Sequence, residues 1–420
     1  MGRSSQKPSK LQACLHENEI VPLSKGRRGT TDMRIIDVDS HFNEPADWFV
    51  QANPSLAAKL PKMTVAEQLL DIVVGDLFSS VPPALRPDPL KLIPPYVLDA
   101  YEKSLAGGEP PQIAVDAGAF APEAWQPAPR IAWMDKRGIE KQILLPSNGY
   151  HPYRHAMRND PSLALPALDT YNRWALEQMH GYTDRLIPAV VVDLIDVEWS
   201  IAQVISGRER GSRAVFVKAD PHGGKALNHP DFEPFWATCE DLGVAILFHV
   251  GGGRSAMHPG WANNGGDLSS FYRLANLSRR LVPQLAVAAM IFGGVLDRYP
   301  NLAVIVSELG IDWLPDFLET IDREADNSRP RMLSFAPYSL PLKPSEYVQR
   351  QVRVSVVHQQ DVLRPTIDRV PEGIIVFSSD FPHVEGHQEA VALYDAQMEG
   401  MSQSARESFF GRSAAELLKL

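Results

Sequence analysis

The chain has 420 residues, of which 44% are hydrophobic and 22% are charged, proportions that are usual for a globular protein. Its formal net charge of −10 argues against nucleic-acid binding, because such a surface needs an excess of basic residues. The two cysteines, Cys14 and Cys239, are too few for a disulfide framework and fit a reducing, cytoplasmic setting, and no apolar run reaches the roughly 18 residues of a membrane span.

Residues 1–31 are polar and somewhat basic, and they lack the apolar stretch of a secretory signal. We therefore predict a flexible N-terminal arm over 1–31 and one folded domain over 32–420. Within that domain, residues 46–130 form a long insertion that is rich in proline and aromatic residues. Connections of this length are usually functional, so we expect the insertion to form a lid over the active site.

Short runs rich in β-branched residues follow one another along the domain, and several are almost continuously apolar, as parallel strands buried on both faces are. The runs are 34–40, 142–146, 186–193, 213–218, 244–250, 302–308, 352–357 and 374–380. Helix-like segments separate most of them, for example 167–182, 231–243, 280–300 and 404–420. This alternation predicts a (β/α)8 barrel. A doubly wound open sheet is the alternative, but the first run lacks the glycine-rich turn of that fold.

The reactive residues of such a barrel lie at the carboxyl ends of its strands. The first run ends in Asp39-Ser40-His41, where alternate residues of a strand point to the same side. The side chains of Asp39 and His41 can therefore bind one Zn-type ion, with Asp37 deeper on the same side to orient a ligand. The alternative is an ordinary polar strand end, with Asp39 capping the turn.

Acidic and imidazole side chains recur at three further strand ends. His249 ends the apolar run 244–250, Glu308 ends 302–308, and Asp380 ends 374–380. Each has an ordinary structural explanation: a buried core histidine, an ion-pair partner of an arginine, and a cap before a proline. Their joint occurrence instead favours a divalent metal held by Asp39, His41, His249 and Asp380, with Asp380 and Glu308 transferring protons.

Five stretches carry a resemblance to a known family: IDVDSHFNEPADW, FHVGG, GGVLDRYPNLAVIVSELGIDWLP, FSSDFPHVEG and FFGRSAAELL. Together they resemble the amidohydrolase-related family, in the branch of non-oxidative decarboxylases that includes aminocarboxymuconate semialdehyde decarboxylase. The likeness runs from Arg34 to the C-terminus. It implies a homodimer in which His41, His249 and Asp380 bind one divalent metal. Zn²⁺ is expected, with Mn²⁺ as the alternative because Asp39 replaces the family's first histidine or glutamate by a harder ligand.

One departure from the family pattern concerns Glu308. The decarboxylases carry a histidine after the sixth strand as their candidate acid/base, so proton transfer here must fall to Glu308, Asp380 or another group. The resemblance favours decarboxylation of a small carboxylated or aromatic-derived substrate. A glutamate beside the metal favours hydrolysis of a C–C, amide or lactone bond instead. A third alternative is a non-catalytic barrel with a structural metal.

Three further side chains are candidates for substrate binding. Lys218, at the end of the fourth predicted strand, either contacts a substrate carboxylate or makes a structural ion pair. Arg173 is either a substrate anchor or a solvated helix residue. His383, three residues after Asp380, is expected to line the mouth of the site.

Overall fold

The computed structural model describes residues 33–61, 103, 112–250, 259–262, 268–328, 337–357 and 363–420. The predicted arm over 1–31 lies outside the described residues, as do residues 62–102 and 104–111 of the predicted lid.

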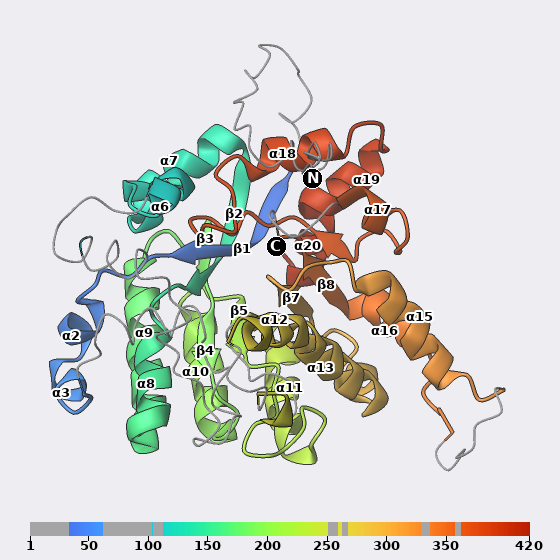
Figure 1. The fold of residues 1–420 in the computed structure, drawn as a ribbon, viewed down its shortest axis with the longest axis horizontal. Coiled ribbons are helices and arrows are strands. Elements are labelled where there is room, and N and C mark those ends of the chain that lie inside the picture. The colour runs from blue at the N-terminus through green and yellow to red at the C-terminus, as the bar shows by residue number, and fades with distance from the viewer. Residues whose placement is uncertain are drawn as a thin grey trace, which may run out of the picture. The chain divides into compact units, whose positions relative to one another are not determined.

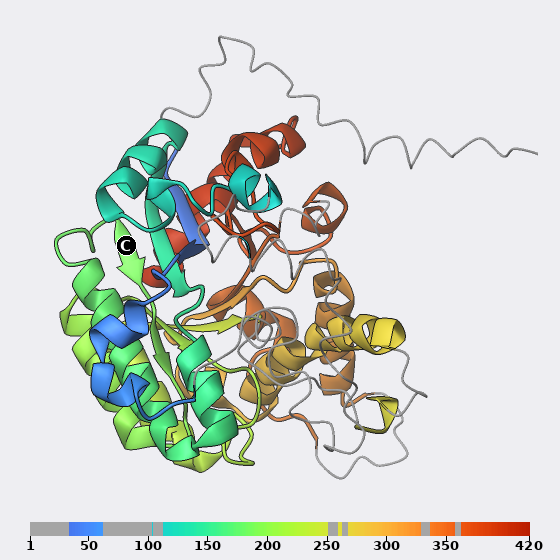
Figure 2. The same cartoon turned by 60° about the vertical axis from the view of Figure 1, so that its left-hand side comes forward.

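Short parallel strands alternate with helices that surround them (Figures 1 and 2). The strands of the described residues are β1 Ile35–Phe42, β2 Ile139–Pro146, β3 Leu186–Pro188, β4 Val190–Val192, β5 Ala214–Val217, β6 Ala245–His249, β7 Val304–Ser307, β8 Val352–Ser355 and β9 Ile375–Val376. Strands β1–β3 pair in order, and strands β4–β9 pair in order, every pair being parallel.

The two sets of strands make one barrel. Strands β3 and β4 are the two halves of the predicted strand 186–193, interrupted at Ala189, whose N–H donates to the Leu144 carbonyl at 2.9 Å. At the other seam, the segment after β9 bonds to β1: the Asp380 N–H donates to the Asp39 carbonyl at 2.9 Å, and the His41 N–H donates to the Phe381 carbonyl at 2.7 Å. The predicted (β/α)8 barrel is confirmed, since the open-sheet alternative would leave these edges apart.

The helices outside the strands follow the expected segments. They are α2 Trp48–Ala52, α3 Pro54–Ala57, α6 Gln112–Ala117, α7 Pro127–Arg137, α8 His151–Asn159, α9 Ala164–Gln178, α10 Val197–Glu209, α11 Glu233–Leu242, α12 Leu268–Arg279, α13 Leu281–Phe292, α14 Val295–Arg298, α15 Leu314–Ala325, α16 Pro344–Gln351, α17 Leu363–Ile367, α18 Ala390–Gln397, α19 Gln403–Glu407 and α20 Ser413–Leu418. No helix in the described part of the chain is long and apolar enough to cross a membrane.

Local sequence signals set several helix boundaries. Helix α7 begins with Pro127, whose fixed φ suits the first helical turn, and it ends at Gly138 with φ 71°. Helix α11 ends at Gly243 with φ 61°, and the Asp196 carboxylate accepts the Trp199 N–H to cap α10. These ends direct each chain segment back toward the next strand of the barrel.

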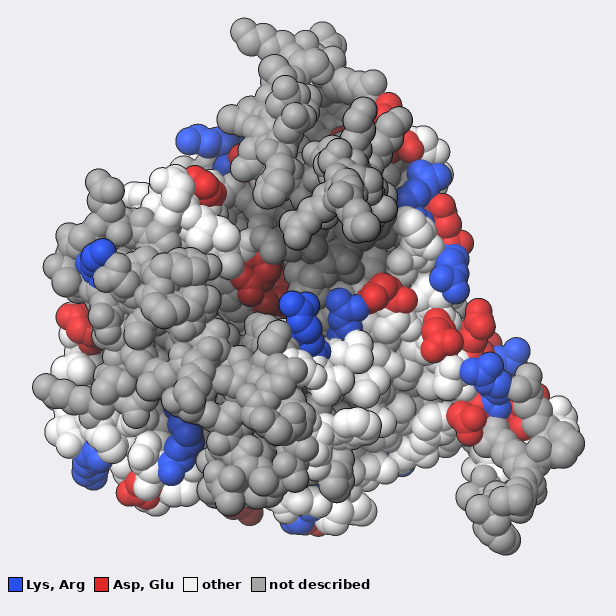
Figure 3. All heavy atoms as spheres, in the orientation of Figure 1, with Lys and Arg blue, Asp and Glu red and all other residues white. Residues whose placement is uncertain are grey.

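Every residue of β1 is buried, and its alternation gives it two different faces. Ile36 and Val38 belong to the hydrophobic core, which also includes Leu145, Phe216 and Val376 from other strands. On the surface, Figure 3 shows basic and acidic side chains interspersed among the described atoms of one face, without a continuous basic stripe.

Candidate active site

Acidic and imidazole side chains from four strand ends meet at the carboxyl end of the barrel. Asp39 and His41 come from β1, His249 is the last residue of β6, Glu308 follows β7, and Asp380 follows β9. All five are buried. The structure therefore brings together every residue predicted to be a metal ligand or a proton-transferring group, because the carboxyl ends of parallel strands lie at one end of a barrel.

The separations between these side chains suit ligands of one ion. The His41 Nε2 lies 3.6 Å from the Asp39 Oδ1 and 3.5 Å from the Asp380 Oδ1, and the His249 Nε2 lies 3.4 Å from the Asp39 Oδ1. These distances exceed those of good hydrogen bonds. Ligands held at about 2.1 Å in a tetrahedral zinc site lie about 3.4 Å from one another, which matches the three separations.

The same side chains carry buried polar atoms that make no hydrogen bond of good geometry with the described residues. These atoms are both carboxylate oxygens of Asp39 and of Asp380 and the Nε2 atoms of His41 and His249. Buried polar atoms are nearly always bonded to something, because leaving them unpaired costs free energy. Candidate ligand atoms of Asp39, His41 and His249 lie within 4.8 Å of one another, as do those of His41, Glu308, Asp380 and His383, and each set fits a divalent cation.

The orientation of both histidine rings supports this fit. The Nδ1 of His41 faces the Pro146 carbonyl at 3.1 Å, and the Nδ1 of His249 faces the Val250 carbonyl at 2.7 Å. A carbonyl can only accept, so each Nδ1 carries the proton and donates it there. The Nε2 lone pair of each ring is thereby left to face the cluster, as a metal ligand requires.

Glu308 and His383 border the cluster. The Glu308 Oε2 lies 2.9 Å from the His249 Nε2, and the His383 Nδ1 lies 3.0 Å from the Asp380 Oδ1. The ring of His383 stacks on that of His41 with centroids 3.7 Å apart. Glu308 and Asp380 both have left-handed backbone conformations, with φ of 58° and 51°. Such conformations cost about 1–3 kcal/mol and are often found at functional sites.

Burial and crowding shift the acid–base properties of the cluster. Burial raises the pKa of Asp380 well above its usual value, and the nearby carboxylates of Glu308 and Asp39 raise it further. Burial alone would lower the pKa of His249, but Asp39 and Glu308 raise it well above its usual value. Burial, followed by the charge of His383, lowers the pKa of His41 to about 3. A divalent cation would relieve this crowding of negative charge.

Lys218, at the end of β5, makes the ion pair that was one of its two predicted roles. Its Nζ donates to the Asp193 Oδ2 at 2.7 Å and to the Tyr153 hydroxyl at 2.8 Å. The Asp193 Oδ1 also lies 2.7 Å from the His222 Nδ1. Burial would raise the pKa of Asp193, but His222 and Lys218 hold it below its usual value. Lys218 follows β5, the strand next to β6, and its side chain remains 17% exposed.

Arg173 does not join this group. It lies on α9 with its side chain 53% exposed, and its Nε bonds to Asp169 one turn earlier at 3.1 Å. The buried residues of α9, which include Tyr171 and Asn172, form the face that packs against the barrel. Of the two roles predicted for Arg173, the structure shows the contacts of a solvated helix residue, with the guanidinium on the solvent side of an outer helix.

The structure also shows residues that the sequence did not single out. Arg130 of α7 is fully buried and bonds to the backbone of His41, and Tyr153 and His222 complete the surroundings of Asp193. Nothing in the spacing of the chain marks these partners, since each lies far in sequence from the group that it contacts. In the sequence alone, a buried arginine of a helix cannot be told from a solvated one, because the difference lies in the neighbours that the fold brings to it.

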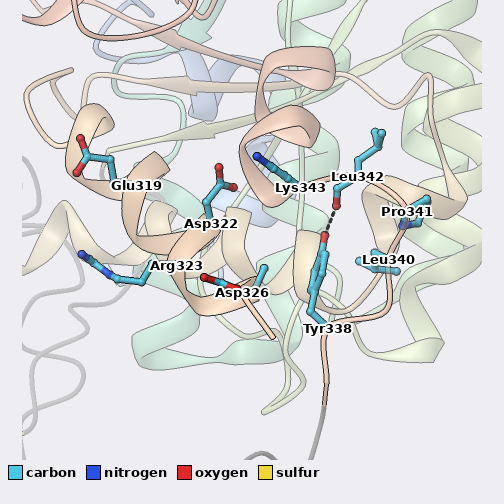
Figure 4. A pocket seen from close by; sticks show the side chains of 10 residues that line it. Glu319, Asp322, Arg323, Asp326, Tyr338, Leu340, Pro341, Leu342 and Lys343 are labelled. Atoms are coloured by element: carbon cyan, nitrogen blue, oxygen red, sulfur yellow. Dashed lines mark hydrogen bonds between the residues drawn. The ribbon is translucent and has the colours of Figure 1, made fainter. Parts of the chain in front are cut away.

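A surface cavity of about 750 Å³ is a different feature from the cluster (Figure 4). It is lined by residues of the segments 319–326 and 338–343, and none of the predicted site residues lines it. The chemistry of the molecule gathers instead at the strand ends of the barrel.

Comparison with known proteins agrees with this geometry. A family model described as amidohydrolase matches residues 36–420. A 2-amino-3-carboxymuconate-6-semialdehyde decarboxylase from Dictyostelium discoideum is 30% identical over 200 residues, which cover 47% of this chain and 51% of that protein. The match thus spans about half the length of this curated relative.

Solved structures share the fold at lower sequence identity. An amidohydrolase from Mycobacterium avium subsp. paratuberculosis superposes with a TM-score of 0.67 at 22% identity, covering 92% of this chain and 99% of that one. A 5-carboxyvanillate decarboxylase from Novosphingobium aromaticivorans, complexed with manganese and 4-hydroxy-3-methoxy-5-nitrobenzoic acid, gives a TM-score of 0.61 at 18% identity, covering 93% and 98% of the two chains. These likenesses confirm the barrel.

Proposed function

Because this chain belongs to the amidohydrolase family, we propose that it is a metal-dependent carboxy-lyase that removes CO₂, without oxidation, from a small carboxylated or aromatic-derived molecule. The observation that carries the proposal is the gathering of Asp39, His41, His249 and Asp380, in two overlapping sets that share His41, with buried ligand atoms that make no hydrogen bond of good geometry. The decarboxylase from Dictyostelium discoideum and the manganese-containing decarboxylase structure support this choice of chemistry.

The four side chains would hold one divalent metal, which would polarise a substrate oxygen as a Lewis acid. Two imidazoles and two carboxylates suit Zn²⁺, which we place first. Mn²⁺ is the alternative, since Asp39 and Asp380 are hard ligands and the Novosphingobium enzyme was crystallised with manganese. Glu308 could add a third carboxylate next to the ion.

Proton transfer falls to Glu308 and Asp380 in this proposal. When the C–C bond to the carboxylate breaks, its electron pair stays on the remaining carbon, and that carbon must gain a proton. The Glu308 carboxyl lies 2.9 Å from the His249 Nε2, so it is next to any atom bound in the centre. It would hold the proton and deliver it to the carbon, and Asp380, which follows β9 two strands away, would be the second group able to transfer a proton.

Lys218 and His383 would bind the substrate. An ammonium group has three N–H donors, and those of Lys218 reach Asp193 and Tyr153. We propose that a third donor contacts a substrate carboxylate. His383, with its side chain 27% exposed, would line the entrance beside Asp380.

Hydrolysis is the second candidate, and the position of Glu308 favours it. A carboxylate this close to a metal ligand could accept a proton from an attacking water, so that a C–C, amide or lactone bond is cleaved. A barrel with a purely structural metal is the third candidate. The hydrolase would release a different product from that of the carboxy-lyase, and the structural barrel would release none.

A product analysis of metal-loaded protein separates these candidates. We expect CO₂ release, in equal amount to the acid consumed, from a member of a panel of hydroxylated benzoates and muconate-like acids. The His249→Ala variant should keep its fold and lose both metal and turnover. Product that has gained water without CO₂ would favour hydrolysis, and a variant that unfolds as it loses metal would favour the structural role.

We also propose a homodimer and a cytoplasmic setting. Leu277, Leu281 and Leu285, spaced four residues apart along α12 and α13, are 67%, 49% and 63% exposed. Helix α13 itself carries no charged residue, so two copies of this helix can meet without like-charge repulsion. Cys239 is buried and unpaired, which suits a reducing compartment. Light scattering after size-exclusion chromatography should give twice the mass of the chain, and the mass of one chain would contradict the dimer.

A further inference from the structure

We propose that Arg130, acting through Gln142 and Asp37, is a positioning residue that fixes the metal ligands of β1 and of the segment after β9, and thereby sets the affinity for the metal. The inference rests on the proposed metal-binding function. It concerns residues behind the cluster, none of which would touch the ion.

The side chain of Arg130, in α7, donates hydrogen bonds beside the seam between β1 and the segment after β9. Its Nη2 donates to the His41 carbonyl at 2.6 Å, and its Nη1 donates to the Ser40 Oγ at 3.0 Å and to the Gln142 Oε1 at 3.1 Å. Its other donors reach the backbone carbonyls of Glu123 and Ala124. The five N–H groups of the guanidinium are thus matched by five acceptors, three of them on β1 and β2.

The contact continues to the other side of the seam. The Ser40 hydroxyl, which accepts from Arg130, donates to the Phe381 carbonyl at 3.0 Å. The guanidinium carbon of Arg130 also lies 4.6 Å from the centre of the Phe381 ring, in cation–π range. Phe381 directly follows Asp380, so one side chain of α7 holds the residues next to ligands from two strands.

A second arm of the network reaches Asp380 through its other neighbour. The Gln142 Nε2 donates to the Asp37 Oδ2 at 2.8 Å. Asp37 in turn accepts the Ser379 hydroxyl at 2.6 Å and the Ser379 N–H at 3.0 Å, and its Oδ1 faces the Asp39 N–H at 3.3 Å. The side chains of Asp37, Gln142 and Arg130 are all 0% exposed.

These hydrogen bonds fix the positions of the ligands on both sides of the seam between β1 and the segment after β9. Asp39 and His41 are reached through their own backbone atoms, and Asp380 is held through the residues before and after it. Hydrogen bonds of this kind fix the side chains that bind a metal, and their loss usually weakens metal affinity by about 10–100-fold. Lysine could not replace Arg130, because an ammonium cannot span the acceptors of Ser40, His41 and Gln142 at once.

A purely structural arginine would affect stability but not the metal. Arg353 provides the comparison, since it is also buried and donates to the backbone carbonyls of Gln349 and Val352. It lies in β8 near the amino end of that strand, the end opposite the cluster. Arg353→Lys is therefore the matched control for Arg130→Lys.

The test is a titration of the full-length, metal-free proteins with Zn²⁺ and with Mn²⁺. We expect Arg130→Lys to weaken the binding about 10–100-fold relative to the unaltered protein, and Arg353→Lys to leave it unchanged, even if both lower Tm. The visible spectrum of the Co²⁺-loaded protein, which reports ligand geometry, should change only in Arg130→Lys. Asp37→Asn, which keeps the shape of the side chain, should weaken the binding in the same direction and decides the matter if Arg130→Lys does not fold.

The outcomes are distinguishable. If Arg130→Lys binds the metal as tightly as the unaltered protein, the positioning role alone is overturned. If Arg130→Lys does not fold, the same holds for Asp37→Asn. An equal loss in Arg353→Lys overturns it as well, because the effect would then be general destabilisation. Failure of the unaltered protein to bind either ion overturns the proposed function from which the inference starts.

Discussion

Glu308 occupies the position where proton transfer and metal binding are hardest to separate, because its carboxyl contacts the same His249 nitrogen that faces the cluster. If Glu308 transfers a proton, Glu308→Gln keeps the shape of the site and removes the transferable proton. We expect kcat to fall about 10²–10⁴-fold while the metal content stays at the level of the unaltered protein. Glu385, whose charge also acts on Glu308, is the nearby control, and Glu385→Gln should retain kcat. Loss of metal from Glu308→Gln would show instead that Glu308 is a ligand.

Lys218 gives a second prediction at this scale. Removing an ammonium that contacts a substrate carboxylate should cost about 1.5–3 kcal/mol of binding, so Lys218→Met should raise KM roughly 10–100-fold. Metal affinity should not change. Tyr153→Phe keeps the lysine and removes one of its partners, and its KM should therefore change much less. Equal effects of the two variants on KM would mean that Lys218 serves only to hold its neighbours.

The sequence could predict those side chains of the candidate site whose direction follows from their position along a strand. Asp39 and His41 share a side because alternate strand residues do, and His249 and Asp380 each stand where an apolar run stops. Arg173 and Arg130 show the limit of this reasoning. One is solvated and the other fully buried, and only the packing of α9 and α7 decides which.

Glu44 links two elements, the loop after β1 and the loop after β2, and it makes a pH-dependent contribution to their contact. Its Oε2 accepts the Asn148 N–H at 2.7 Å, yet burial raises its pKa from 4.5 to about 7. Between these two values the folded chain keeps a proton that the unfolded chain has released. Stability from Glu44 is therefore complete below about pH 4.5 and is lost as the pH rises through 7.

The Glu44→Gln variant cannot ionise, so it should escape that loss. Relative to the unaltered protein, its free energy of unfolding should improve by roughly 1–3 kcal/mol between pH 5 and pH 8. Urea unfolding of both proteins at the two pH values gives the comparison. A difference that stays constant with pH would contradict the raised pKa.

The C-terminal helices pack closely on the start of β1, and this contact predicts the effect of a substitution at Gly411. A Cβ added at Gly411 would lie 2.1 Å from the Arg34 carbonyl oxygen, which is backbone and cannot rotate away. Gly411→Ala should destabilise the fold by about 1–3 kcal/mol, seen as a lower Tm. Gly207→Ala meets a methyl group of Val190, a side-chain atom that can shift, so its effect should be smaller. A Tm for Gly411→Ala equal to that of the unaltered protein would contradict the close contact.

The elements themselves were predictable where hydrophobic periodicity was strong. Each of the predicted strands is present, but 186–193 is interrupted after Pro188, which has no N–H to continue the ladder. The predicted helix 280–300 divides into α13 and α14 at Gly293 and Gly294, the latter with φ 74°. The segment 404–420 contains a π-helical turn at Ser408–Arg412, which no sequence period distinguishes from α-helix.

At the scale of the whole molecule, the barrel is shared with proteins of 18% and 22% identity. Parallel strands with apolar faces specify such a scaffold through pattern rather than through particular residues, which explains why sequence alone predicted it. Activity depends on a few side chains at the strand ends and on loops, so it follows from the site and not from the fold.

Metal binding should therefore stabilise the whole domain. At a free metal concentration of about 100 Kd, binding to the folded state adds about 2.7 kcal/mol to the free energy of unfolding. Removal of the metal by a chelator should lower Tm, and added Zn²⁺ or Mn²⁺ should restore it. In His249→Ala the same treatment should change Tm little, and an equal response of that variant would place the ion elsewhere.

The most direct measurement is the anomalous scattering of crystals grown with Zn²⁺ or Mn²⁺. We predict one strong peak within about 2.0–2.3 Å of side-chain atoms of Asp39, His41, His249 and Asp380. The peak should vanish in crystals of His249→Ala. An ordered ion bound elsewhere, or no ion at the cluster with the four side chains still in place, would contradict a metal-dependent active site in this barrel.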